Sequence, residues 1–183
     1  MKKIFFTFAI LTAFLTSVCA YSKTIQSDLE NSLIRLHIIA QSDSEFDQNM
    51  KLKVRDAVLL KTADTDISDT DNFLRIAEDA ANKCLRENGV DYRAAAQFGV
   101  FHFPEKSYKN ITLPAGDYRG VRIILGDGGG KNWWCVMYPP LCVESKTEKA
   151  QMTLKAALRP DTYEVITQKP QVRFKILELL SND

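Results

Sequence analysis

The chain has 183 residues, of which 24 are Lys or Arg and 23 are Asp or Glu, giving a formal net charge of +1 at pH 7. This balance, without a clustered basic segment, argues against a nucleic-acid partner. With 45% hydrophobic residues, a domain of this length can bury a core without a structural metal or many disulfides.

Residues 1–20 have the pattern of a signal peptide. Two lysines precede an apolar run from Ile4 to Leu15, and the segment ends with the small residue Ala20. The run is shorter than the ~20 residues that span a bilayer comfortably, so we expect secretion and cleavage after Ala20. Retention as an uncleaved membrane anchor is the alternative.

The mature chain is expected to start with an irregular segment. The segment from Tyr21 is polar and has no hydrophobic period, so we predict a flexible leader over residues 21–32. Residues 33–183 are predicted to form a single domain. Because the chain is expected to be exported, its remaining cysteines enter an environment in which disulfides persist.

Hydrophobic periodicity predicts both strands and helices in this domain. The expected strands are 33–40, 96–103, 118–125 and 172–180. The first expected helix starts after Ser42, where Glu45 completes a capping box. Two further helices are expected over 70–87 and 147–158. These elements predict an α+β fold with a mostly antiparallel sheet of four or five strands and two main helices packed on one face.

Side-chain spacing also predicts which helical residues are buried. The first helix should bury Phe46, Met50 and Val54, and should direct lysines such as Lys51 elsewhere. Cys84 lies on the buried stripe of the second helix, and we interpret it as a small apolar filler.

Two loops resemble ligand sites but lack required residues. The acidic segment 63–71 lacks the glycine and the glutamate that a calcium loop needs at its sixth and twelfth positions. The segment 126–131 lacks the first glycine of a phosphate-binding loop and precedes no helix, so we predict a hairpin or a wide loop. No cofactor, metal or small-molecule substrate is expected.

The sequence offers little support for catalysis. An enzyme needs an activated group with partners, and no paired-acid, metal-ligand or nucleophile motif is present. His37 and His102 both lie in expected strands, where a hydrogen-bonded structural role is the commoner one. An exported hydrolase with a Cys-based or His-based site is kept as the alternative to a binding protein.

Residues 132–142 contain both tryptophans of the chain. In an extended segment Trp133 and Trp134 point to opposite faces, so the two rings cannot enter the same core. One interpretation is that the second ring covers a satellite cluster or a neighbouring strand. The other is that it serves as a recognition anchor, and the residues alone leave both open.

Two cysteines flank a Pro-Pro corner in this segment. Cys135 and Cys142 lie on either side of Pro139-Pro140, and a turn there could bring two extended arms within bonding reach. A disulfide would fix the shape of the tryptophan-bearing loop. Separate buried thiols are the alternative.

Three separated blocks occur along the chain: RLHIIAQSDS from Arg35, LPAGDY from Leu113 and NWWCVMYPPLC from Asn132. In this order they resemble the stage II sporulation protein R family of endospore-forming bacteria, over about residues 33–142. Gln41 and the pair Met137-Tyr138 are mild departures from the family pattern. The motif residues carried over are Arg35, Ser42, Asp43, Ser44, Arg55, Asp56, Gly116 and Asn132.

The resemblance implies a secreted signalling protein, not an enzyme, in the space between the forespore and mother-cell membranes. Its implied partner is a membrane-embedded aspartic protease of the mother cell, which it activates so that pro-sigma-E is processed. Contact with the membrane is expected only through that partner. The resemblance assigns no contact residues.

We expect the contact surface itself from the residue types. A rigid loop of aromatic residues and prolines loses little entropy on docking. The expected contact residues are therefore Trp133, Trp134, Tyr138, Pro139 and Pro140. Arg55 and Asp56 are expected to form a buried pair that braces the first helix on the sheet.

Overall fold

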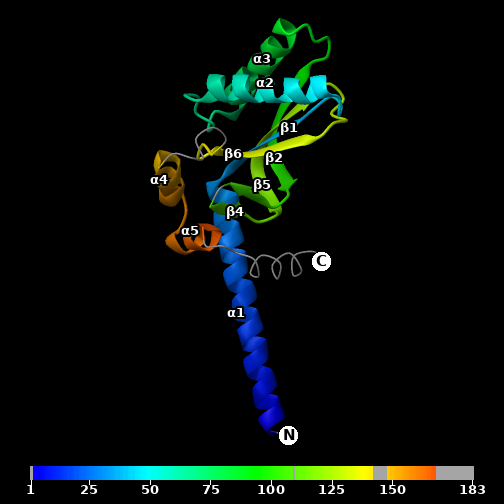
Figure 1. The fold of residues 1–183 in the computed structure, drawn as a ribbon. Helices are drawn as coiled ribbons and strands as arrows, with labels where there is room; N and C mark the ends of the chain where they lie inside the picture. Colours follow the sequence, from blue (N-terminus) through cyan, green and yellow to red (C-terminus); the bar gives the residue numbers. More distant parts are fainter. Residues whose placement is uncertain (1, 109, 142–147, 168–183) are drawn as a thin grey trace.

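The computed structural model describes residues 2–108, 110–141 and 148–167 (Figure 1). The elements, in chain order, are α1 (Lys2–Ser32), β1 (Ile34–Ile39), α2 (Glu45–Thr62), α3 (Thr70–Glu87), β2 (Ala94–Phe103), β3 (Lys106–Tyr108), β4 (Ile111–Leu113), β5 (Gly116–Leu125), β6 (Asn132–Tyr138), α4 (Glu148–Ala157) and α5 (Pro160–Thr167).

A four-stranded sheet in the order β2-β5-β1-β6 forms the centre of the domain. β5 pairs antiparallel with β2 and parallel with β1, and β1 pairs antiparallel with β6. β3 and β4 form a separate antiparallel hairpin. The α+β class and the mostly antiparallel sheet are thus confirmed, with the β1 and β5 pair as the parallel exception.

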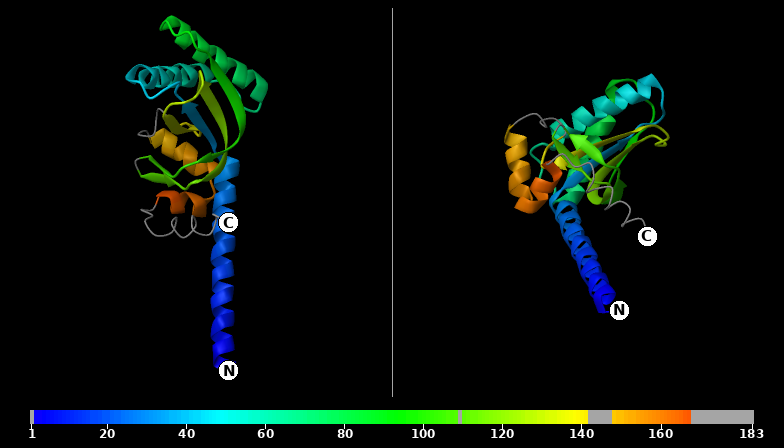
Figure 2. Two further views of the ribbon diagram at one scale, coloured as in Figure 1. Left: turned by 90° about the vertical axis from the view of Figure 1, so that its right-hand side faces the viewer. Right: turned by 60° about the horizontal axis from the view of Figure 1, so that its bottom comes forward.

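Helices α2 and α3 lie over one face of this sheet (Figures 1 and 2). They bury the first core cluster, in which Leu36 and Ile38 of β1 meet Val54 of α2 and Phe73 of α3. Amphipathic helices on an apolar sheet face give this two-layer arrangement. The predicted bounds of α3 are confirmed, and its C-cap is Asn88.

A second core cluster lies toward the other end of the sheet. The C-terminal part of α1, the β3–β4 hairpin, α4 and α5 pack there against Phe103, Tyr118 and Val136 of the sheet (Figure 2). The predicted flexible leader over 21–32 is wrong, because these residues continue α1 and bury Ile25 and Leu29. Ile25, Leu29 and Leu33 repeat every four residues, which is an apolar helical stripe.

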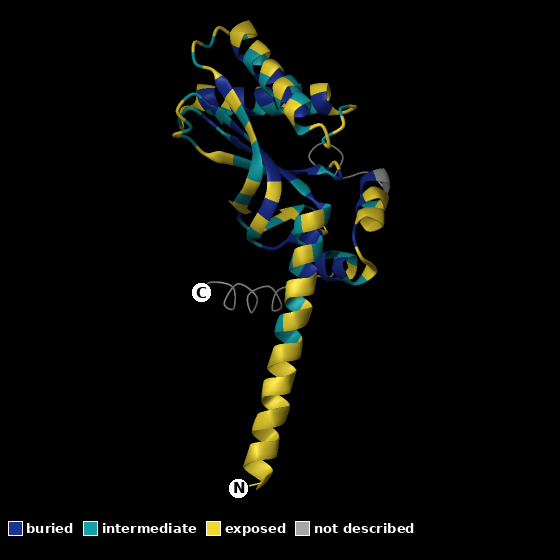
Figure 3. Cartoon of the chain, turned by 180° about the vertical axis from the view of Figure 1, so that it is seen from behind, coloured by how far each residue is buried: buried dark blue, intermediate teal, exposed yellow. Residues whose placement is uncertain are grey.

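The first part of α1 extends away from the domain and is exposed to solvent (Figure 3). Its large apolar side chains are uncovered, with Ile4 at 74% and Phe5 at 81% exposure. α1 is long and apolar enough to cross a membrane, a property that membrane anchors share with signal sequences. It is therefore compatible with the predicted signal peptide over 1–20.

The start of α2 differs from the prediction. Its N-cap is Ser44, whose side chain accepts a hydrogen bond from the Asp47 amide at 3.1 Å, and not Ser42. Phe46 is 55% exposed, because the inward position of the first turn is taken by the buried Asp47. Lys51 is buried, contrary to expectation, because its amine reaches backbone and side-chain oxygens.

The glycine-rich segment 126–131 is a wide connection and not a hairpin. β1 lies between β5 and β6, so the segment passes over the end of β1. Gly126 and Gly128 have φ values of +56° and +67°, a region that favours glycine. The predicted helix over 147–158 is present as α4. The predicted strand over 172–180 lies outside the described residues.

Replacing Leu29 with Ala is expected to lower the free energy of unfolding by about 2–5 kcal/mol, because it opens a cavity where α1 meets the second cluster. Leu29 is fully buried, whereas Met152 of α4 is 72% exposed. Met152→Ala is therefore the matched control, expected within about 0.5 kcal/mol of wild type. Urea unfolding measures both variants. A Leu29→Ala protein as stable as wild type would show that α1 does not dock through this residue.

Candidate functional site

The tryptophan-bearing strand β6 forms one edge of the sheet, with β1 as its neighbour. In the β1–β6 register Trp133 lies opposite Ile38 and Trp134 lies opposite His37. Both indole rings are half-buried, and Trp133 packs against the first cluster while Trp134 packs against the second. The prediction that the rings enter different cores is confirmed.

Trp133 connects β6 to helix α2. The guanidinium carbon of Arg55 lies 4.5 Å from the centroid of the Trp133 ring, a cation–π contact. Arg55 also pairs with Asp56 at 2.7 Å. The expected buried pair is wrong for Asp56, whose side chain is 63% exposed, because successive helical residues point in different directions. Only Arg55 braces the helix on the sheet.

Trp134 forms an aromatic stack on the opposite face of the sheet. Its ring lies parallel to the His37 imidazole at 3.6 Å and meets Phe103 edge-on at 5.0 Å. The His37 Nε2 is hydrogen-bonded to Asn132 Oδ1 at 2.8 Å. Burial lowers the pKa of His37, with Arg122 as a further cause, so the imidazole is neutral near pH 7.

The chain turns after β6 at Pro139 and Pro140. The amide of Leu141 donates to the carbonyl oxygen of Val136 at 3.2 Å, which closes the turn. The Tyr138 hydroxyl donates to the carbonyl oxygens at the end of α2, Thr62 at 3.3 Å and Thr65 at 3.0 Å.

The predicted contact residues of this turn differ in how accessible they are to a partner. Pro139 is buried and Tyr138 is half-buried, so these two hold the turn, whereas Pro140 is exposed. Cys135 is buried. Cys142 lies outside the described residues, and the bridge between the two stays a prediction.

The segment after β1 clamps the glycine-rich connection that leads into β6. The amides of Gly129 and Gly130 donate to the carbonyl oxygens of Gln41 at 3.1 Å and Ala40 at 2.9 Å. These backbone bonds join two loops that are far apart in the sequence. They fix where β6 begins.

Two side chains, one of them from the first motif block, reinforce this clamp. The Asp43 carboxylate accepts a hydrogen bond from the Lys131 amide at 2.8 Å. The amine of Lys51 donates to the Lys131 carbonyl oxygen at 2.9 Å. Asp43 therefore has a structural position next to the start of β6, whereas Ser44 caps α2.

Asp47 is a buried carboxylate near the candidate site that the sequence analysis missed. Its carboxylate accepts hydrogen bonds from the Ser42 hydroxyl at 2.5 Å and the Tyr92 hydroxyl at 2.6 Å. These bonds, first that from Ser42, hold the pKa of Asp47 below its usual range. The available signal was its place on the apolar stripe of α2, three residues before Met50, where a carboxylate is unexpected.

Arg35 is fully buried, and no described carboxylate pairs with it. Its guanidinium carbon lies 4.4 Å from the Phe103 ring centroid and 4.8 Å from that of Tyr118. One terminal nitrogen donates to the Tyr108 hydroxyl at 3.3 Å. The motif arginine is therefore held by aromatic rings, at the boundary of the second cluster.

Gly116 lies beside α1 in the same region. A Cβ at this position would meet the terminal amide of Gln26 on α1, the flexible end of a side chain that can move aside. Packing against α1 therefore does not by itself require glycine at this motif position.

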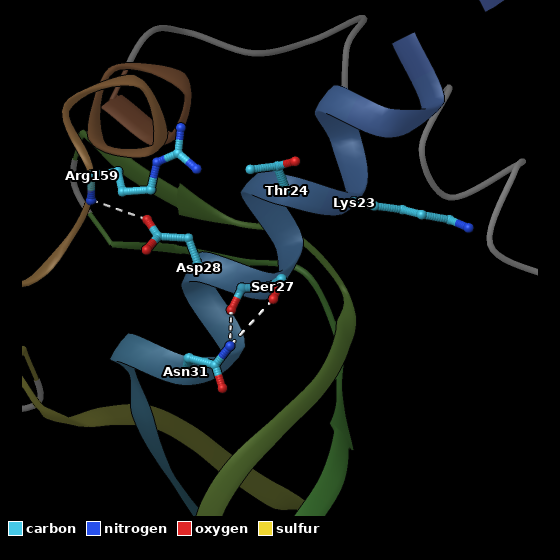
Figure 4. A pocket seen from close by; sticks show the side chains of 6 residues that line it. All are labelled: Lys23, Thr24, Ser27, Asp28, Asn31 and Arg159. Carbon is cyan, nitrogen blue, oxygen red and sulfur yellow. Dashed lines mark hydrogen bonds between the residues drawn. The ribbon is translucent and has the colours of Figure 1, made fainter. Parts of the chain in front are cut away.

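The histidines and the surface depressions give no catalytic arrangement within the described ranges. His102 is exposed and lies 3.1 Å from Asp117. The described residues contain no cluster of His, Cys, Asp and Glu that could hold a metal. A shallow polar depression lies beside α1 (Figure 4), where Asp28 accepts a hydrogen bond from the Arg159 amide at 3.0 Å. That contact anchors α1 to the start of α5.

Replacing Tyr92 with Phe is expected to lower the free energy of unfolding at pH 7 by about 1.5–3 kcal/mol, because a hydrogen bond to a charged carboxylate is lost. Asp47 has a lowered folded pKa, so this stabilisation is present above the unfolded value of about 3.9. It disappears as the pH falls through the folded pKa.

Urea unfolding of wild type and Tyr92→Phe from pH 7 down toward pH ~2 measures this effect, with Tyr163→Phe on α5 as the control. The gap between wild type and Tyr92→Phe should narrow at low pH. A gap that stays constant over this range would contradict the assignment of the Tyr92 bond to the ionised carboxylate.

Comparison with known proteins identifies the family of this chain. The family described as stage II sporulation protein R (spore_II_R) matches residues 30–148. The "Stage II sporulation protein R" of Bacillus subtilis (strain 168) is 37% identical over 123 residues, covering 62% of this chain and 55% of that relative. The match thus spans about half of the relative's length, and no solved structure matches. Since the family match extends from the end of α1 to the start of α4 and includes every motif residue, the chain belongs to the stage II sporulation protein R family.

Proposed function

We propose that this chain is a secreted signalling protein of sporulation that activates a membrane-embedded aspartic protease of the mother cell, leading to processing of pro-sigma-E. Membership of the family supports the role in sporulation. The exposed apolar part of α1 supports export. In this proposal the protein acts between the forespore and mother-cell membranes, and it touches the membrane only through the protease.

The observation that carries a binding role is the placement of β6. This strand lies at the edge of the sheet, and three of the motif residues, Asp43, Arg55 and Asn132, hold it or the residue before it. Arg55 fixes Trp133, and His37 with Asn132 fixes Trp134. A surface fixed before docking loses less entropy when it binds, so it suits recognition more than catalysis.

We assign the contact with the protease to β6 and the turn that follows. Half-buried tryptophans are frequent energetic centres of protein interfaces. Trp133 and Trp134 are half-buried, and Pro140 is exposed next to them in the sequence. Tyr138 and Pro139 contribute by holding the turn in shape.

We propose further that Cys135 and Cys142 are bridged. The hydrogen bond from the Leu141 amide to the Val136 carbonyl oxygen draws together the residues next to these two cysteines. Cys19 and Cys84 are free thiols, so neither competes for the bridge. A loop this short would gain only about 2–3 kcal/mol, so the main effect is to fix the turn after β6.

The alternative of an exported hydrolase gains no support from the described residues. Burial raises the pKa of the Cys84 thiol, which disfavours the thiolate that a nucleophile requires. His37 is buried between Trp134 and Asn132, away from either free cysteine. The family likewise points to a role other than catalysis.

Replacing Trp134 with Ala is expected to reduce processing of pro-sigma-E by about tenfold or more, as loss of a central interface anchor does. Co-expression with the protease and pro-sigma-E measures processing, and thermal unfolding checks that the variant is folded. Pro140→Asp is the companion variant, because Pro140 is exposed and its replacement should leave the melting temperature unchanged while weakening the signal. Full processing by both folded variants would refute this contact surface.

Cys135→Ser and Cys142→Ser are expected to behave alike, because each removes the same bridge. Both should lose signalling to a similar degree, and the double variant should be no worse than either single one. Free-thiol titration of the exported protein measures the bridge directly. Loss of activity in only one of the two variants would instead indicate a reactive thiol.

A further inference from the structure

Four side chains form a row across the sheet on the face turned away from α2 and α3. Gln97 of β2 pairs in register with Arg122 of β5, Arg122 with His37 of β1, and His37 with Trp134 of β6. Because side chains alternate along a strand, paired residues share one face. We call these four residues the Arg122 row.

Three members of the Arg122 row are accessible, whereas His37 and the neighbouring part of the same face are covered. Gln97 is exposed, and Arg122 and Trp134 are half-buried. Toward the other end, the positions around Tyr118 and Val136 lie in the second core cluster beneath α1 and the hairpin. The row therefore lies where the covering layer ends.

Arg122 is held in place without a counter-charge among the described residues. Its guanidinium carbon lies 3.7 Å from the centroid of the Phe101 ring, and its Nε is buried without a hydrogen-bond partner. Stacking on a ring leaves the in-plane N–H groups of arginine free for a planar acceptor such as a carboxylate.

The sheet residues around this row carry positive charge and no negative charge, and the acidic Glu30 of α1 lies at the covered end of the face, near Tyr118. The residues of the four strands that point to this side, read from the register, are Ala95, Gln97, Gly99, Phe101, Phe103, Gly116, Tyr118, Gly120, Arg122, Ile124, Arg35, His37, Ile39, Asn132, Trp134 and Val136. None is Asp or Glu, and Arg35, which lies on the same side, also has no ion pair with a described carboxylate.

We propose that the Arg122 row binds an acidic peptide segment of a partner protein, with a carboxylate of that segment on the Arg122 guanidinium and an apolar side chain on the Trp134 ring. The charge complementarity of this face selects an acidic occupant. The inference rests on the proposed function for the identity of the partner, which is the protease, but not for the chemistry of the contact.

An anionic membrane surface fits this face less well than an acidic peptide. Attraction to lipid headgroups needs clusters of about four to eight Lys or Arg. Here Arg122 is the one accessible cation of the row, Arg35 is buried, and the whole chain has a net charge of +1. One arginine flat on an aromatic ring next to an indole suits a single carboxylate with an apolar neighbour.

A direct binding test needs no protease. The exported protein with Trp133→Phe keeps Trp134 as its one tryptophan, since the chain has two. Its fluorescence is followed while a capped hexaglutamate peptide, a capped hexalysine peptide or phosphatidylglycerol vesicles are added. Hexaglutamate alone should change the signal, and the change should weaken with added salt.

Variants assign the binding to Arg122. In the same background, Arg122→Gln should weaken hexaglutamate binding about tenfold or more, and Arg122→Lys, which keeps the charge, should weaken it less. Arg75→Gln is the matched control, because Arg75 on α3 is an exposed arginine paired with Asp79. Equal hexaglutamate binding by the Trp133→Phe protein with and without Arg122→Gln would overturn the inference. Binding of the protein to the vesicles but not to hexaglutamate would overturn it too.

Processing of pro-sigma-E separates this inference from the proposed function. If wild type supports processing, Arg122→Gln should reduce it and Arg75→Gln should not, provided that both proteins show the wild-type melting temperature. If wild type supports no processing although hexaglutamate binds through Arg122, the proposed function fails and the acidic-segment site stands. If the folded Arg122→Gln protein supports normal processing and the Trp133→Phe protein does not bind hexaglutamate, the acidic-segment site is refuted and the proposed function stands.

Discussion

The pairing of β1 with β6 is the interaction on which the rest of the structure depends. β1 is an inner strand, and its alternation sends Leu36 and Ile38 into the first cluster and places Arg35 and His37 on the other face. β6 follows the same alternation. A slip of one residue in this pairing would exchange the faces of Trp133 and Trp134, so whatever fixes the register also fixes the proposed contact surface.

Several motif residues are best understood as fixing that register from both ends of β6. At the start of the strand, the backbone around Gln41 and the Asp43 carboxylate hold the residues that lead into it. At its end, the Tyr138 hydroxyl donates to the carbonyl oxygens of Thr62, the last residue of α2, and of Thr65, which follows the helix. Side chains that position a strand in this way need not touch a partner for their replacement to affect binding. A motif residue and a contact residue are therefore different categories here.

The sequence predicted the parts of the fold that depend on local spacing. The bounds of α3, the strands β1, β2 and β5, and the opposite faces of Trp133 and Trp134 all follow from periodicities of 3.6 or 2 residues. The insertion of β1 between β5 and β6 was not predictable in this way, because strand order depends on contacts distant in sequence. The same holds for the C-terminal part of α1, because its apolar stripe is buried only when α4 and α5 pack against it in the folded chain.

The sequence indicated a location for the candidate site but not the contacts around it. The Trp-Trp pair and the prolines directed the prediction to β6 and its turn, yet nothing local showed that Asp47 would meet Tyr92 or that Arg122 would stack on Phe101. One partner of each pair, Tyr92 or Phe101, lies just before β2 or within it, and this part of the chain contains no motif block. Exposure could not be read from the sequence either, since Pro139 and Pro140 are neighbours and only the second is exposed.

Aromatic rings on the sheet face turned away from α2 and α3 explain how Arg35 and Arg122 are held there without a paired carboxylate among the described residues. Removing a charge from water is costly, and a cation–π contact offsets part of that loss by about 2 kcal/mol or more when it is desolvated. Arg35 has two such rings and Arg122 has one. Arg35 is fully buried, whereas Arg122 is half-buried, so at Arg122 the carboxylate of the proposed acidic segment would supply the attraction that the fold lacks. Any ligand that binds the folded state alone also stabilises it, so occupancy of this face and stability of the domain are linked.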